Sequence, residues 1–174
     1  METALKQYTR RDKLSLRETV VLALFAALLI VSKEVLAALP NIEIVTLLTI
    51  LLTHHLGIKA LLSVYTFVVA QMLIYPVDII WGVAYLYVWA LLVLTVCAVR
   101  RYGNAVIYTV IAGIFGILFG VLCSIPAFFV GGFGYGVSYI ISGLSFDVVH
   151  AVGNIATTAL LFYPLDKAMQ KVLK

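Results

Sequence analysis

The chain consists of long apolar runs separated by short breaks that hold most of the charged residues and prolines. A helix needs about 20 residues to cross an apolar layer about 30 Å thick. The pattern therefore predicts an all-α integral membrane protein, a six-helix bundle in which a single membrane domain covers residues 1–174. The predicted membrane helices span residues 16–39, 42–54, 58–74, 79–99, 104–124 and 139–163.

Local signals set the ends of several helices. Ser15, followed three residues later by Glu18, has the spacing of a capping box at the start of the first helix. Pro40 and Pro76 are expected to end helices, because the residue before a proline is biased away from the helical region. The second run is short: about 13 residues rise only about 20 Å, so we expect it to be tilted, partly unwound or extended by its outer loop. Residues 128–136, rich in Gly and Phe, are expected to form an outer loop that acts as a lid.

The composition agrees with this pattern and argues against an ATPase, a soluble enzyme or a nucleic-acid-binding protein. Hydrophobic residues make up 64% of the chain and charged residues 11%, and the mean hydropathy is +1.12, values typical of membrane proteins. The predicted helices leave no room for an ATPase or a soluble catalytic domain. The net charge of +4 lies mainly in the breaks. We therefore interpret it as a signal of topology and expect no nucleic-acid partner.

The positions of the basic residues predict the orientation. In a six-helix arrangement, 11 of the 12 Lys and Arg residues fall on one side. Cytoplasmic segments carry an excess of these residues, so we expect both termini in the cytoplasm and the protein in the cell membrane. Five crossings would place the tail lysines outside, which disfavours that count. The residues on the inner side are Lys6, Arg10, Arg11, Lys13, Arg17, Lys59, Arg100, Arg101, Lys167, Lys171 and Lys174.

Polar and aromatic residues of several helices are expected at one depth, in the outer half of the bilayer. Ionisable residues at such depth are costly and usually face a cavity or a partner, and aromatic rings suit stacking on a flat ligand. We therefore predict a substrate pocket at this level. The alternative is that the charged side chains extend to the interface and that Trp and Tyr form an interfacial belt. The candidate residues are Lys33, Glu34, Gln71, Trp81, Tyr85, Trp89, Asp147, His150 and Asn154.

A pair of small residues predicts a contact between helices. Ala23 and Ala27 lie four residues apart on the cytoplasmic half of the first helix. Small residues at this spacing let another helix approach closely. The pair therefore indicates either a docking face for a partner or internal packing within the bundle.

Motifs of enzymes are missing from the sequence. The chain has no Walker A sequence, no HExxH and no GxSxG. We therefore expect no catalysis and no bound cofactor. His54 and His55 are adjacent and should point to different faces of a helix, so no metal site is predicted.

Two longer segments carry a family resemblance. Residues 39–48 (LPNIEIVTLL) and 143–154 (GLSFDVVHAVGN), together with the alanine pair, the size and the six predicted helices, resemble the substrate-binding S components of energy-coupling factor (ECF) vitamin transporters. The resemblance covers essentially the whole chain. It implies an outward-facing pocket for a vitamin or related micronutrient, with cobalamin-type or vitamin B6-type compounds favoured.

The resemblance also implies partners. An S component docks through its first-helix alanines on a membrane T component that carries two cytoplasmic ATPase subunits, and it topples in the membrane to deliver its substrate. The alternative is a self-sufficient carrier or channel for a small solute. That class predicts inverted repeats or broken helices at the midplane, and the sequence shows no convincing internal repeat.

Overall fold

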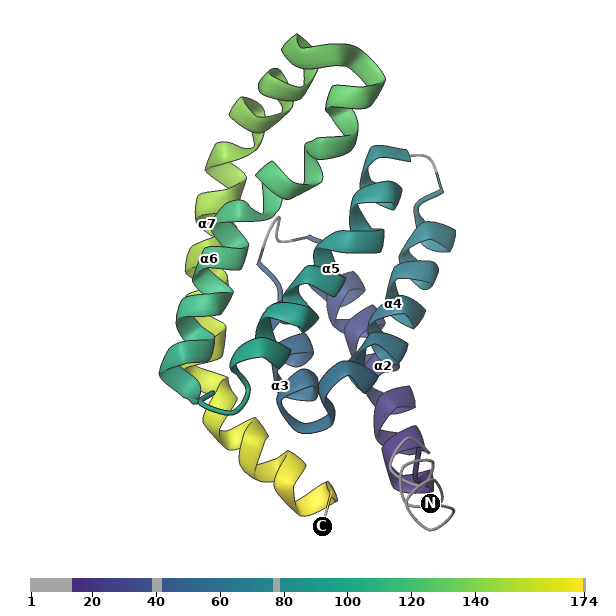
Figure 1. The fold of residues 1–174 in the computed structure, drawn as a ribbon, viewed down its shortest axis with the longest axis vertical. Helices are drawn as coiled ribbons and strands as arrows, with labels where there is room; N and C mark the ends of the chain where they lie inside the picture. The colour runs from purple at the N-terminus through teal and green to yellow at the C-terminus, as the bar shows by residue number, and fades with distance from the viewer. Residues whose placement is uncertain (1–13, 39–41, 77–78, 174) are drawn as a thin grey trace, which may run out of the picture.

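The computed structural model describes residues 14–38, 42–76 and 79–173. Every regular element in these ranges is a helix, which confirms the all-α class. The elements are α2 (Leu16–Val35), α3 (Val45–Leu56), the 3-10 turn η1 (Gly57–Lys59), α4 (Ala60–Ile74), α5 (Ile79–Val99), α6 (Ala105–Cys123) and α7 (Ile125–Leu173). Figure 1 shows them as an elongated bundle in which α6 and α7 run side by side.

The helices are those of a membrane protein. Within the described residues, four helical segments are long and apolar enough to cross a membrane: Val45–Ile74, Ile79–Val99, Ala105–Cys123 and Ile125–Leu173. Large apolar side chains also cover the outside of the bundle, with Leu73 77% exposed and Val106 73% exposed. A surface of this kind is stable against lipid and would aggregate in water.

The predicted count of six crossings is not supported. In the described residues α3, η1 and α4 form one continuous helical run, Val45–Ile74, which reduces six helices to five, and α2 is not among the four segments that qualify as membrane spans. The break predicted at Gly57 is a 3-10 turn with helical hydrogen bonding, since the backbone N–H of Ala60 donates to the carbonyl of Gly57. The helices therefore do not by themselves fix the orientation of the termini.

Gly57 nevertheless changes the direction of the chain. Its φ of 59° lies in the left-handed region, which glycine adopts without the steric cost that a side chain adds. Figure 1 shows α3 and α4 as two arms that meet at this turn. The turn is closed from outside by Arg100, whose Nη2 donates to the carbonyl of His55 at 3.4 Å.

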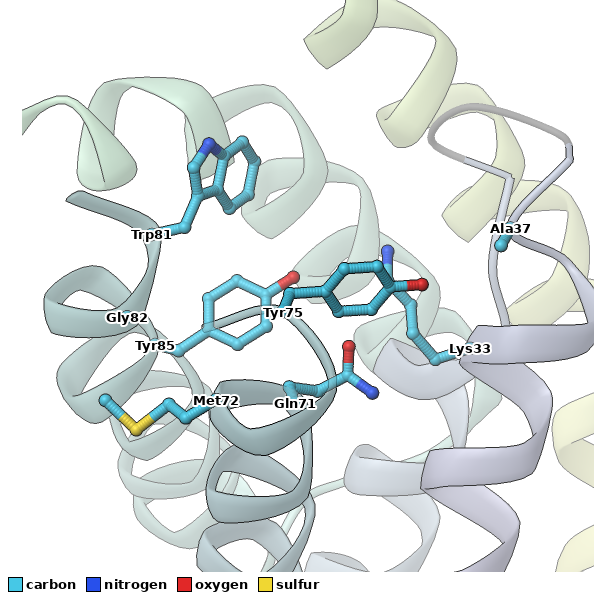
Figure 2. A pocket seen from close by; sticks show the side chains of 8 residues that line it. All are labelled: Lys33, Ala37, Gln71, Met72, Tyr75, Trp81, Gly82 and Tyr85. Atoms are coloured by element: carbon cyan, nitrogen blue, oxygen red, sulfur yellow. The ribbon is translucent and has the colours of Figure 1, made fainter. Parts of the chain in front are cut away.

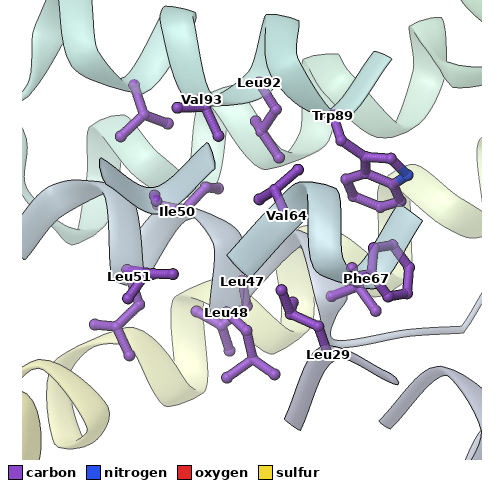
Figure 3. Close-up of a cluster of buried hydrophobic side chains, with 14 of the residues drawn as sticks. Leu29, Leu47, Leu48, Ile50, Leu51, Val64, Phe67, Trp89, Leu92 and Val93 are labelled. Carbon is purple, nitrogen blue, oxygen red and sulfur yellow. The ribbon is translucent and has the colours of Figure 1, made fainter. Parts of the chain in front are cut away.

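The short helix α3 lies at the centre of the core. Nine consecutive residues, from Val45 to Thr53, are buried, which requires neighbours on all sides. These neighbours are α2, α4, α5, α6 and α7. Figure 3 shows the apolar side chains of α3 packed against those of α2, α4 and α5. The helix α3 is too short to cross the membrane alone, and packing against these five helices fixes its position.

A carboxylate caps the start of α3. Glu43 Oε2 accepts from the backbone N–H of Val45 at 3.0 Å, and Oε1 accepts from that of Thr46 at 3.2 Å. These N–H groups have no partner inside the helix, and a negative charge there is favoured by the helix dipole. At the start of α2 the predicted capping box is confirmed: the backbone N–H of Ser15 donates to Glu18 at 2.8 Å and that of Glu18 to the Ser15 hydroxyl at 3.1 Å.

The segment predicted as an outer loop is helical instead. Residues 128–136 belong to α7, which is much longer than the predicted span 139–163. The helix is interrupted only at Gly132, whose φ of 77° and ψ of −175° make a kink. In Figure 1 the chain bends at this end and returns along α6. The expected lid loop is therefore wrong: this end is a helix kinked at Gly132, with exposed Phe129 before the kink and exposed Phe133 after it.

Candidate binding site

A cavity of about 380 Å³ lies where the last turns of α2 and α4 meet the first turns of α5. Figure 2 shows that its side chains come from these three helices and from the residues just after α2 and α4. The wall combines one basic group, one amide and three aromatic rings with smaller apolar groups. Its residues are Lys33, Ala37, Gln71, Met72, Tyr75, Trp81, Gly82 and Tyr85.

Helical spacing aligns these side chains. Gln71 and Tyr75 are separated by one turn at the end of α4, and Trp81 and Tyr85 by one turn at the start of α5, so each pair lies on one helix face. Gly82 contributes space because it has no side chain: a Cβ there would lie 3.3 Å from the end of Met72. The two aromatic rings of α5 touch each other edge-on, with centroids 5.8 Å apart.

Glu34 stands beside the cavity with both oxygens occupied. Its Oε1 accepts from Gln71 Nε2 at 2.9 Å, and its Oε2 accepts from the Tyr75 hydroxyl at 2.8 Å. The hydrogen bond to this carboxylate raises the pKa of the Tyr75 phenol, so the hydroxyl remains a donor. Lys33, the preceding residue, makes no hydrogen bond or ion pair with the described residues.

A second polar group of residues lies on α7. Asp147, His150 and Asn154 share one face of the helix, as their spacing predicts, and are 3%, 3% and 1% exposed. His150 Nε2 is 3.1 Å from Glu43 Oε1. Asp147 Oδ1 accepts from the backbone N–H of Gly120 at 2.9 Å, and Asn154 Nδ2 donates to a backbone carbonyl of α6 at 3.4 Å. These side chains therefore bind α6 and the start of α3, and they do not line the cavity.

An aromatic layer separates the two groups. The ring of Phe119 contacts His150 at 4.8 Å between centroids and Trp89 at 5.7 Å. It also contacts Trp81 at 6.1 Å and Tyr85 at 6.3 Å. Trp89 is 2% exposed and belongs to the core shown in Figure 3. Of the nine candidates, four line the cavity, Glu34 adjoins it, Trp89 lies in the layer, and three lie beyond it.

Several polar atoms beyond this layer lack partners. Buried polar atoms in proteins are nearly always hydrogen-bonded, so each exception needs an explanation. On α7 the exceptions continue one helical turn after Asn154, at Thr158, and one more lies on α3, at Thr49. Among the described residues these atoms are Thr49 Oγ1, Trp89 Nε1, Asp147 Oδ2, His150 Nδ1, Asn154 Oδ1 and Thr158 Oγ1.

Sequence reasoning did not identify Tyr75, Met72, Gly82 and Ala37 as part of the site. Tyr75 precedes Pro76 and carries the signal of a helix end, yet its one-turn spacing from Gln71 also places it beside that amide. Nothing in the sequence pattern distinguishes Gly82 or Met72 from the other residues of the apolar runs. Asn41 and Asp78, polar residues of the outer breaks, lie outside the described residues.

The alanine pair lies on the outside of the bundle. Ala23 and Ala27 are exposed, whereas Ala26 between them is 6% exposed and packs inward. The pair borders an apolar groove of about 450 Å³ between α2 and α4. The hydroxyl of Ser63 in this groove already donates to the carbonyl of Leu22 at 2.7 Å. In the described structure the pair is therefore exposed at the edge of this groove, and its role stays a prediction.

His54 and His55 approach one carboxylate despite being adjacent. His55 Nε2 lies 2.8 Å from Asp166 Oδ1, and His54 Nε2 lies 3.9 Å from the same atom. His54 Nδ1 is 2.7 Å from the hydroxyl of Tyr108. The three groups are near enough to hold a metal ion. The Arg100 guanidinium bonded to the His55 carbonyl places a competing positive charge beside them.

The chain was also compared with known proteins. Comparisons with protein families, with curated proteins and with solved structures found no match. The cavity, the alanine groove and the charge distribution are therefore the basis for a functional proposal.

Proposed function

We propose that the protein is the substrate-binding S component of an ECF-type importer. It captures a small micronutrient of the vitamin class in the cavity between α2, α4 and α5. The observation that carries this proposal is the cavity itself, because a partly polar, aromatic-lined pocket of this size at the end of a membrane bundle is a typical small-molecule site. Its volume, near the lower end of the usual range of about 300–1,000 Å³, favours a vitamin B6-sized compound over a corrinoid.

The same proposal includes six crossings with both termini in the cytoplasm. Two contacts support this orientation, because they bring segments that carry basic residues to one end of the bundle. Lys59 pairs with Glu18 at 2.7 Å, and Asp166 near the tail contacts His55 at 2.8 Å. In Figure 1 the start of α2, the turn η1 and the end of α7 lie at this end. A Lys171→Cys variant without other cysteines should react with an impermeant maleimide only from the cytoplasmic side; labelling from outside would reverse the orientation.

The groove beside Ala23 and Ala27 is the proposed docking face for a membrane helix of the T component. Its support is that the alanines are exposed and border an apolar groove between α2 and α4. In lipid, helices associate through close packing of small residues, since burying apolar surface gives little gain there. The partner complex would supply the two ATPase subunits.

Uptake measurements test whether this protein binds the substrate while partner subunits supply the energy for transport. The protein is reconstituted in liposomes alone and together with the T component and ATPases of its source organism. Small molecules released from the purified protein by denaturation are identified by mass spectrometry and used as the transported probe. An S component accumulates the probe only with its partners and ATP. Transport by the protein alone would identify a self-sufficient carrier and overturn the proposal.

A further inference from the structure

Among the described residues that line the cavity, Lys33 is the only charged one. It is half-buried at the end of α2 and makes no hydrogen bond or ion pair with the described residues. Figure 2 shows its side chain rising toward the ring of Tyr75, into the space shared with Gln71 and Tyr85. An ammonium group at this depth of a membrane bundle is costly unless a partner compensates it.

The nearby carboxylates are already engaged. Both oxygens of Glu34 accept hydrogen bonds, from Gln71 at 2.9 Å and from Tyr75 at 2.8 Å. Glu43 caps α3 and contacts His150 at 3.1 Å. The charge of Lys33 acts on Glu43 at longer range, but Lys33 forms no salt bridge with either acid. Of the described residues, the cavity wall therefore presents a positive group, and not a negative one, toward any molecule that enters.

The rest of the wall is suited to a flat ring. Tyr75, Trp81 and Tyr85 supply three aromatic rings, and Met72 adds a polarizable thioether that makes favourable contacts with aromatic rings. The absence of a side chain at Gly82 leaves room between the rings of α5 and Met72. A cavity of about 380 Å³ holds a molecule of one or two rings.

We propose that the cavity selects a planar aromatic acid, with its carboxylate or phosphate bound by the Lys33 ammonium and its ring lying among Tyr75, Trp81 and Tyr85. This inference rests on the proposed function, because it names the substrate class of the same site. It assigns recognition of charge to Lys33 and recognition of shape to the aromatic rings. Glu34 then acts as a positioning residue that fixes Gln71 and Tyr75.

Ligands that share a ring and differ in charge test this assignment. The first series is nicotinate, nicotinamide and 1-methylnicotinamide, which are anionic, neutral and cationic. Two further pairs are indole-3-acetate with its amide, and pyridoxine 5′-phosphate with pyridoxine. Dissociation constants are measured by calorimetry on the detergent-purified full chain. We expect at least one acid to bind roughly 10- to 100-fold more tightly than its neutral partner, the range for a hydrogen bond to a charged group.

Substitutions at Lys33 connect the preference to this residue. Lys33→Gln should remove the advantage of the acid and leave binding of the neutral partner within about twofold, while Lys33→Arg should retain much of the advantage. Lys171→Gln, at the exposed end of α7, is the matched control and should change nothing. A melting temperature equal to that of the unchanged protein shows that each variant is folded.

The outcomes separate the two proposals. Equal or tighter binding of the neutral or cationic members overturns the acid assignment, and so does the absence of binding by any acid. If such a neutral or cationic ligand is also taken up only with the T component and ATPases, the S-component proposal stands without this inference. If uptake needs no partners, the proposed function fails whatever the charge preference.

Discussion

At the scale of single residues, the contact between Glu43 and His150 joins the start of α3 to α7. Both side chains are about 95% or more buried, and Glu43 Oε1 lies 3.1 Å from His150 Nε2. The carboxylate also caps α3 through the backbone N–H groups of Val45 and Thr46. Removing one member of a buried polar contact leaves the other without its partner, and this costs more than the contact contributes.

Glu43→Gln and His150→Gln should therefore be coupled. Each single substitution is expected to lower the free energy of unfolding, and the double substitution should cost less than the sum of the two. The coupling free energy should lie within the usual range of about 0.5–3 kcal/mol for contacting residues. Denaturation of the four proteins in detergent gives this value.

The half-exposed pair of Glu18 and Lys59 provides the control cycle. Its two atoms are 2.7 Å apart, but the side chains are 23% and 27% exposed, and contacts of this kind contribute about 0–1 kcal/mol. Additive effects at Glu43 and His150, or a larger coupling at the control pair, would show that the buried contact is not a stabilising unit.

The sequence was a good guide to which polar residues lie deep in the bundle, and a poor guide to their neighbours. Counting along each helix gives its relative height, and Lys33, Gln71, Trp81 and Tyr85, which were expected at one level, line one cavity. The rotation of each helix about its axis depends on packing against the others. That rotation turns Asp147 toward Gly120 on α6, and helix counting alone cannot supply it.

At the scale of elements, the error at residues 128–136 comes from applying a rule for water-soluble proteins to an apolar chain. Glycines and aromatic residues are signals of a loop in a water-soluble protein. In an apolar environment each backbone N–H and C=O needs an internal partner, which favours helix even for a glycine-rich stretch. The glycines interrupt the helix at one position, Gly132, where φ is 77°.

The contact between α6 and α7 depends on Gly116. A Cβ at this position would lie 2.6 Å from Cα and 2.7 Å from the backbone nitrogen of Ala151, and a backbone cannot move aside as a flexible side chain does. Gly116→Ala should therefore destabilise the bundle by about 1–3 kcal/mol, as overpacking in cores usually does. Thermal denaturation in detergent measures the effect as a lower melting temperature.

Gly143→Ala is the matched control for this prediction. Gly143 also lies within a helix, and a Cβ there would meet nothing within 4 Å. Alanine is the better helix former by about 1 kcal/mol, so this variant should be as stable as the unchanged protein or more so. Equal melting temperatures of the two variants would mean that α6 and α7 do not approach through Gly116.

At the scale of the whole molecule, ligand binding and partner docking are assigned to different places on α2. Lys33 lies at one end of the helix, in the cavity, whereas Ala23 and Ala27 lie nearer the other end, beside the outer groove. The helix rises about 1.5 Å per residue, so Ala23 and Lys33 are separated by about 15 Å along its axis. A substitution in the groove can therefore change docking without touching the ligand.

Ala23→Trp should abolish partner-dependent uptake and leave ligand binding unchanged. The indole would fill the groove that the T component's helix is proposed to enter, and close packing is the main source of helix association in lipid. Ala159→Trp places the same ring on an exposed position of α7 and should transport normally. The measurements are probe uptake in liposomes with the T component and ATPases, and the dissociation constant of the purified protein. Normal uptake by Ala23→Trp would remove the groove from the docking interface, and loss of ligand binding would show that the two ends of α2 are not independent.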